Sequence, residues 1–81
     1  MEYKLPDLNL VFGKILRKKR KMRGMSQADL SVKSNLSRSF ISQLENGLRD
    51  PSCWTIFKIS YAMRIKPSIF IDEVEHSLNK Y

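Results

Sequence analysis

Residues 34–40 read SNLSRSF and separate two segments that both have a helical pattern of apolar residues. Asn35 tolerates the left-handed backbone conformation that a tight turn between helices requires, second only to glycine. Leu36 then offers an apolar side chain to a core, and Ser37 is a good N-cap for the next helix. A turn of three or four residues between short helices at a steep angle is typical of the helix-turn-helix motif. The stretch therefore predicts this motif over residues 26–46.

Helical patterns continue on both sides of the motif, and we find no convincing strand. Capping residues and prolines mark where each helix begins, and Gly24 and Gly47 mark two ends. The predicted helices cover residues 8–22 (capped by Asp7), then begin after Ser26, Ser37, Ser52 and Pro67. The expected inner face of the second helix consists of Ala28, Leu30 and Val32. We predict an all-α fold, a five-helix bundle that contains a helix-turn-helix, in a single domain over residues 1–81.

Composition narrows the class of protein. The 81 residues are 42% hydrophobic and include one cysteine, Cys53, and one histidine, His76. One cysteine cannot form an internal disulfide, and the two residues together cannot supply the three or four ligands of a zinc site. We found no carboxylate pair, no nucleophile beside a base and no glycine-rich phosphate loop, so an enzyme is not expected, and neither is a cofactor or a small-molecule ligand. No apolar run approaches the length of a membrane span, and a cytoplasmic, nucleoid-associated protein is expected.

The charge distribution points to a polyanionic partner. The net charge is +7, and seven of the ten residues in 14–23, KILRKKRKMR, are basic. Such a run is often only the solvated face of a helix, but it also suits a surface that meets nucleic acid or an anionic membrane. A membrane is disfavoured because the apolar stripe of the first helix is expected inside the core.

The sequence MSQADLSVKSNLSRSFISQLENGLRDPS (25–52) resembles the lambdoid repressor/Cro family of helix-turn-helix domains, also called XRE-type. The resemblance covers roughly residues 10–71, and it implies a lambda repressor-like DNA-binding domain. The small size and the third helix also resemble restriction–modification controller proteins, which act as dimers. Some positions depart from the family pattern: Asn35 and Arg64 stand where glycine is usual, and Ser31, Ser34 and Ser60 where a small apolar residue is usual. These departures are physically mild, because serine is small and its hydroxyl can bond to the carbonyl four residues earlier.

In a helix-turn-helix, the second helix of the motif enters the major groove, and its N-terminal side chains meet base edges. Here the candidate base contacts are Ser37, Arg38, Ser39, Ser42 and Gln43. Arg38 is the first candidate, because a guanidinium can pair bidentately with O6 and N7 of guanine. The alternative for Arg38 is a phosphate contact or a solvated side chain.

The candidate phosphate contacts flank this helix. Gln27 lies at the start of the second helix, where free N–H groups suit an anion, and the resemblance implies that its amide holds a phosphate. The full set of candidate phosphate contacts is Gln27, Asn46, Arg49, Lys18, Lys21 and Arg23. The resemblance also implies that Glu45 forms a structural ion pair with Arg20.

A domain that reads only a few base pairs gains specificity by dimerising on a palindrome. The two C-terminal helices, over residues 52–79, carry more apolar side chains than a core requires, so we expect them to form both core and dimer interface. The candidate interface residues are Trp54, Tyr61, Phe70, Ile71, Val74 and Leu78. The sequence thus predicts a homodimeric, sequence-specific regulator of transcription that binds palindromic double-stranded DNA. The alternative is an antitoxin-like or adaptor protein whose main partner is another protein.

Overall fold

The computed structural model describes residues 8–78, and within this range it contains five helices and no strand. They are α1 Leu8–Met22, α2 Gln27–Ser34, α3 Arg38–Glu45, α4 Cys53–Ala62 and α5 Pro67–Leu78. The predicted all-α fold is confirmed, and the predicted helix starts agree with the observed ones. The expected cap at Asp7 lies outside the described residues.

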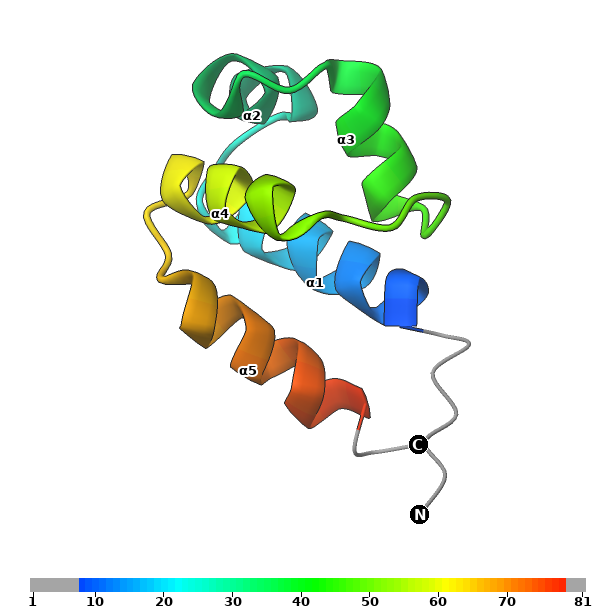
Figure 1. The fold of residues 1–81 in the computed structure, drawn as a ribbon. Helices are drawn as coiled ribbons and strands as arrows, with labels where there is room; N and C mark the ends of the chain where they lie inside the picture. Colours follow the sequence, from blue (N-terminus) through cyan, green and yellow to red (C-terminus); the bar gives the residue numbers. More distant parts are fainter. Residues whose placement is uncertain (1–7, 79–81) are drawn as a thin grey trace.

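The helices form three layers (Figure 1). Helices α2 and α3 form one outer layer, α1 and α4 lie in the middle, and α5 covers the opposite side. In agreement with this arrangement, α1 packs against both α3 and α5, and α4 packs against both α2 and α5. The helix-turn-helix pair is therefore presented on one side of the molecule, with the rest of the bundle behind it.

Serine side chains fix where three of the helices begin. The Oγ atom of Ser26 accepts the backbone N–H of Asp29, while the Asp29 carboxylate accepts the backbone N–H of Ser26, so α2 starts with a capping box. Ser37 caps α3 and Ser52 caps α4 in the same way, each accepting the N–H of the residue three positions later. These bonds satisfy N–H groups that a helix leaves without partners.

Two turns use a left-handed residue that is not glycine. Asn35 (φ 58°) ends α2, and Arg64 (φ 57°) follows α4. The expectation that Asn35 replaces a glycine at the helix-turn-helix corner is confirmed. An arginine in this conformation carries a Cβ that clashes with the backbone, which costs on the order of 1 kcal/mol.

One apolar core lies between the layers. Its buried side chains are Val11, Phe12, Ile15, Leu16, Met25, Leu30, Ile41, Leu44, Ile59, Met63, Phe70 and Val74. Leu36 packs against this core from the turn, as its position in the sequence predicts. The expectation for α2 was wrong at Ala28 and Val32, which are exposed. Since α2 packs on α3 and α4 through a single row of side chains, only Leu30 of the three is covered.

Phe70 and Val74 require a correction. Both were expected at a dimer interface, but they are buried among side chains of the same chain, and the Phe70 ring lies 5.1 Å from that of Phe12. The reason is that α5 packs directly on α1 with this row of residues. Leu78 is partly buried and packs against the same core.

The three serines that replace small apolar residues behave differently from one another. Ser31 donates its hydroxyl to the carbonyl of Leu36, across the helix-turn-helix corner. The hydroxyls of Ser34 and Ser60 are buried and have no hydrogen-bond partner. None of the three hydroxyls therefore bonds to the carbonyl four residues earlier, and Ser34 and Ser60 carry a desolvation cost.

Candidate nucleic-acid interface

The outward face of α3 carries four polar side chains that the sequence proposes as base contacts. They are Arg38, Ser39, Ser42 and Gln43. Positions four residues apart lie on the same side of a helix, so these side chains form two adjacent pairs. Ile41 and Leu44 occupy the opposite face and are fully buried against the bundle. The apolar contacts thus fix the rotation of α3 about its axis and leave this polar row facing outward.

Ser37 stands just before this row and already has a structural task. Its Oγ atom accepts the backbone N–H of Phe40 at 3.0 Å. A hydroxyl that accepts in this way can still donate its own proton. Ser37 therefore caps α3 and keeps one donor for an acceptor outside the protein.

The first turn of α2 lies beside α3 and combines a helix N-terminus with an amide side chain. The capping box lowers the pKa of the Asp29 carboxyl group, first through the backbone N–H of Ser26 and then through its hydroxyl. The amide nitrogen of Gln27 donates to Oε1 of Glu45 at 3.2 Å. One N–H of Gln27 is thus used within the protein, and the second N–H is the one left for an anion.

Arg20 and Glu45 form a buried ion pair with two hydrogen bonds. Nε of Arg20 lies 2.6 Å from Oε2 of Glu45, and Nη2 lies 3.0 Å from Oε1. The third guanidinium nitrogen, Nη1, donates to the carbonyl of Met25 at 2.7 Å. The hydrogen bonds that Arg20 donates to the Glu45 carboxylate raise the pKa of Arg20 above its already high ordinary value. With Gln27 on the same carboxylate, this network joins α1, the α1–α2 turn, α2 and the end of α3.

Gly13 is a packing position in α1 that the sequence analysis did not single out. It is buried in α1, where a Cβ atom would collide with the carbonyl oxygen of Leu44 and lie 2.6 Å from that of Glu45. These carbonyls belong to the last residues of α3, so the absence of a side chain lets α3 pack directly on α1. A glycine inside an otherwise apolar helical pattern was the available signal, because glycine in a helix interior normally costs stability.

Asn46 and Arg49 follow α3, at the opposite end of the motif from the start of α2. Asn46 is exposed and forms the C-cap of α3. Arg49 is also exposed, and its Nε atom donates to Oε1 of Gln43 at 2.9 Å. Both residues therefore lie in the segment that follows the C-terminal end of α3.

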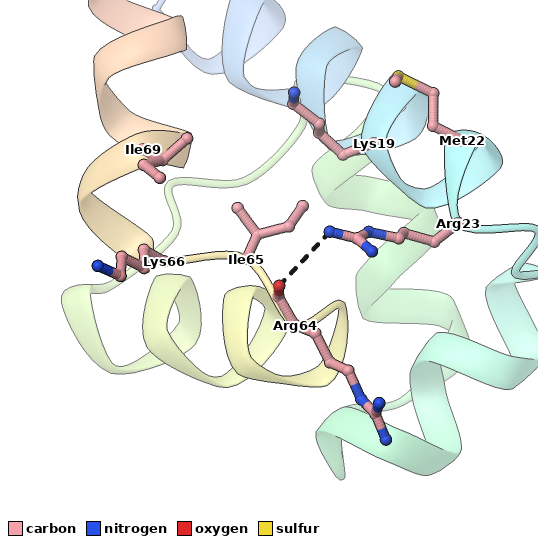
Figure 2. A pocket seen from close by; sticks show the side chains of 7 residues that line it. All are labelled: Lys19, Met22, Arg23, Arg64, Ile65, Lys66 and Ile69. Carbon is pink, nitrogen blue, oxygen red and sulfur yellow. Dashed lines mark hydrogen bonds between the residues drawn. The ribbon is translucent and has the colours of Figure 1, made fainter.

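Two lysines of α1 and Arg23, in the turn after α1, lie toward α5 or the α4–α5 connection. Lys18 lies 3.9 Å from Glu73 of α5, and Lys19 lies 2.6 Å from the same carboxylate. Arg23 turns toward the α4–α5 connection, where its Nη2 atom lies 3.5 Å from the carbonyl of Arg64 (Figure 2). The α5 layer is on the side away from α3 (Figure 1), so these positions do not support the phosphate contacts expected for Lys18 and Arg23. Lys21 is exposed.

A cavity of about 470 Å³ lies beside Arg23. It is open to solvent and is formed by the end of α1, the α4–α5 connection and the start of α5 (Figure 2). Its lining residues are Lys19, Met22, Arg23, Arg64, Ile65, Lys66 and Ile69. Like Lys18, it belongs to the side of the bundle remote from the polar row of α3.

The outer face of α4 exposes large aromatic side chains. Trp54 and Tyr61, both expected at a dimer interface, are 71% and 66% exposed. Phe57, which the sequence analysis did not single out, packs edge-on against Tyr61, with 5.8 Å between ring centroids. Lys58 lies over the Trp54 ring at 5.5 Å. On α5, Ile71 is also exposed. Trp54, Phe57 and Tyr61 lie at helical spacing and share one exposed side of α4, which we call the α4 face.

The part of the chain that the structure describes contains neither a metal-binding cluster nor a membrane-spanning helix. Residues 8–78 bring together no group of three or more His, Cys, Asp or Glu side chains that could hold a metal ion. Within the same range, no helix combines the length and the apolar character that crossing a membrane requires.

Comparison with known proteins gives consistent matches. A helix-turn-helix family model matches residues 16–70. Control protein C.BamHI of Bacillus amyloliquefaciens is 36% identical over 67 residues, which cover 82% of this chain and 83% of that protein. The restriction–modification controller protein C.AhdI of Aeromonas hydrophila has a similar structure, with a TM-score of 0.75 and 35% identity over 76% of this chain and 94% of that chain.

A third comparison includes DNA. The restriction–modification controller protein C.Esp1396I, solved as a tetramer in complex with its natural 35 base-pair operator, matches with a TM-score of 0.81. The identity is 27%, and the match covers 88% of this chain and 93% of that one. The matched family is one of transcription regulators and is not an enzyme family. The chain belongs to the helix-turn-helix family and is a DNA-binding transcriptional regulator homologous to restriction–modification controller proteins.

Proposed function

We propose that this protein acts as a restriction–modification controller, a cytoplasmic regulator that binds a palindromic operator as a homodimer. The observation that carries the proposal is the polar row on α3, which the buried inner face of the helix directs away from the bundle. A helix held in this way fits the major groove of B-DNA, while the other four helices remain behind it.

Arg38 is the main base reader in this proposal. It is the first residue of α3 and it is exposed. Its planar guanidinium matches the two acceptors O6 and N7 of guanine, which is worth about 1–3 kcal/mol of discrimination against another base. Ser39 and Ser42, one turn apart, supply smaller donors and acceptors beside it.

Phosphate contacts are proposed at both ends of the motif. At the start of α2, the free N–H groups of the helix and the second amide N–H of Gln27 face an anion together. At the end of α3, Asn46 and Arg49 meet the other strand. These contacts set the position of α3 in the groove and make binding sensitive to salt, but they carry no direct base information.

The homodimer is proposed to form through the α4 face together with Ile71. Exposed aromatic side chains at helical spacing are typical of a self-complementary interface, and aromatic residues are enriched at such interfaces. The C.Esp1396I tetramer on its operator supports an assembly of several copies on one DNA, because that protein shares this fold.

Selection of binding sites from random DNA duplexes tests the proposal. The expected result is an enriched sequence with two-fold symmetry, in which one guanine per half-site loses its preference in the variant Arg38→Ala. The exposed Lys14→Ala is the control, because Lys14 lies on α1 outside the proposed contacts. Enrichment of no sequence at all would contradict the proposed function.

Sedimentation of the free protein over a range of concentrations tests the dimer. We expect a dimer that the variant Trp54→Glu shifts to monomer, since a carboxylate would be buried without a partner. A monomer at every concentration, together with a stable complex between the α4 face and a second protein, would favour the adaptor function instead.

A further inference from the structure

Gln43 and Arg49 were assigned to different tasks by the sequence, yet the structure joins them by a side-chain hydrogen bond. We infer that Arg49 is a positioning residue for base recognition: it holds the Gln43 amide with its NH₂ group toward the base, so that Gln43 reads a base with a carbonyl acceptor, guanine or thymine, in preference to adenine. The inference rests on the proposed function, because it assumes that α3 lies in the major groove.

The backbone at the end of α3 explains why Arg49 lies beside Gln43. The N–H of Leu48 donates to the carbonyl of Gln43 at 2.9 Å, and the N–H of Gly47 donates to that of Leu44 at 3.1 Å. With Gly47 in the left-handed conformation (φ 74°), these two bonds form a Schellman motif. The motif folds the chain back over the last turn of α3, so the residue after Leu48 returns to the level of Gln43.

Contacts with α1 hold this turn in place on both sides of Arg49. A Cβ atom on Gly47 would lie only 3.0 Å from Cα of Leu10, so the turn packs directly on the α1 backbone. On the other side, the amide nitrogen of Asn9 donates to the carboxylate of Asp50. Arg49 is therefore presented from a short segment with two anchors, and only its side chain has freedom to move.

The chemistry of the bond determines which way the Gln43 amide faces. A guanidinium can only donate, so the atom of Gln43 that meets Nε of Arg49 must be the carbonyl oxygen. The NH₂ group of Gln43 is then the part that remains for a base. Two donors suit O6 and N7 of guanine or O4 of thymine.

Adenine requires a different arrangement. A glutamine pairs with adenine by accepting from N6 with its carbonyl oxygen and donating to N7 with its nitrogen. In this protein, Arg49 already uses one of the two lone pairs of the carbonyl oxygen, so the bidentate pair with adenine would require this oxygen to accept a second hydrogen bond. The two Nη atoms of Arg49 remain available for a phosphate, which links the backbone contact to the base contact.

The test is selection of binding sites with the unmodified protein and three variants: Gln43→Ala, Arg49→Ala and the double variant. Gln43→Ala identifies the operator position that Gln43 reads, as the position that loses its preference. At that position we expect guanine or thymine to be preferred over adenine by about fivefold or more, given the usual discrimination of a base contact. In Arg49→Ala, adenine should become acceptable there, with this preference largely lost. In the double variant, the change at Arg49 should add nothing at that position.

A pure phosphate contact predicts a different result. Arg49→Ala would then weaken binding to all sequences equally, lower the salt dependence by about one phosphate contact and leave every base preference unchanged. This result, or a position that prefers adenine in the unmodified protein, would overturn the inference. Asn46→Ala is the matched control, since it removes a proposed phosphate contact at the same end of α3, and it should change no base preference. If the unmodified protein selected no sequence, the proposed function itself would fail, which is a separate outcome.

Discussion

The contact between α1 and α3 differs sharply from the α4–α5 corner. At the first, Gly13 lets the α3 backbone approach α1 closely, and Arg20 and Glu45 satisfy each other with short hydrogen bonds. At the second, Arg64 adopts a left-handed conformation that suits glycine, and the Ser60 hydroxyl is buried without a partner. The two regions belong to one small domain, but only the first one involves α3, the helix that we propose to enter the major groove.

The difference shows at which positions this fold tolerates a strained backbone or a buried hydroxyl without a hydrogen-bond partner. In the proposed complex, a shift of α3 would misplace the side chains that we expect to meet base edges, so this contact should admit little change. The α4–α5 corner lies on the side remote from α3 (Figure 1). Strain at this corner therefore lowers the stability of the domain without moving α3. Substitutions at the first contact should therefore be harmful, and those at the corner should be beneficial.

The largest effect is expected for Arg20→Ala. It leaves the Glu45 carboxylate buried without its cation, which typically costs about 3–5 kcal/mol of stability. Urea denaturation measures the change. Lys18→Ala is the control: its pair with Glu73 is long and its side chain is 65% exposed, so we expect a change of about 0.5 kcal/mol or less. Equal losses in the two variants would show that the buried pair is not what holds α3 to α1.

Gly13→Ala comes next. In an ordinary helix interior, this change would stabilise by about 1 kcal/mol. Here the new Cβ meets two backbone carbonyls of α3, and forced backbone shifts usually cost about 1–3 kcal/mol, so we expect a net loss of up to about 2 kcal/mol. Thermal unfolding shows the sign directly. Lys14→Ala, at the exposed neighbouring position, should change stability little, and a stabilised Gly13→Ala would contradict the close approach of the two helices.

Ser60→Ala is expected to stabilise the protein. It removes a fully buried hydroxyl without a partner, whose desolvation typically costs about 1–3 kcal/mol, and we expect a gain of about 1 kcal/mol. For a domain of this size, that gain corresponds to a rise in melting temperature of roughly 4–8 °C. Ser31→Ala is the matched control and should destabilise the protein, because it removes the hydrogen bond from the Ser31 hydroxyl to the carbonyl of Leu36. A loss of stability in Ser60→Ala would mean that its hydroxyl has a partner.

A gain of about 1 kcal/mol, similar to that of Ser60→Ala, is expected for Arg64→Gly from relief of the left-handed strain. Asn35→Gly changes a residue with nearly the same φ, but asparagine tolerates this conformation, so its gain should be only a few tenths of a kcal/mol. Melting curves of the two variants give the comparison. A larger gain at Asn35 than at Arg64 would contradict the assignment of strain to the α4–α5 corner.

Much of the fold could be predicted from the sequence because its signals are local. The caps at Ser26, Ser37 and Ser52 act within three residues, so the helix starts agreed with the structure. The turn at Asn35 is likewise a property of one residue and its neighbours. Arg20 and Glu45 are 25 residues apart, and their pairing was expected only from the family resemblance.

Part of the candidate site could not be predicted in this way. Helix α5 has apolar residues on more than one side, and the sequence does not say which side meets α1. Phe70 and Val74 were therefore assigned to a dimer surface although they belong to the core. Lys18 and Arg23 were assigned to DNA for a similar reason, since a basic run around a helix points in all directions.

The sequence by itself determined the five helices, the helix-turn-helix corner and the set of polar residues available on α3, because caps, prolines and apolar spacing act over one or two turns. Only the tertiary structure decided which of those residues work together. Gly13 is important because α3 packs on it, and Arg49 meets Gln43 because a Schellman turn, anchored on α1, brings it back along the helix. Such contacts depend on how the helices pack against one another, and this packing is not encoded in any single stretch of the chain.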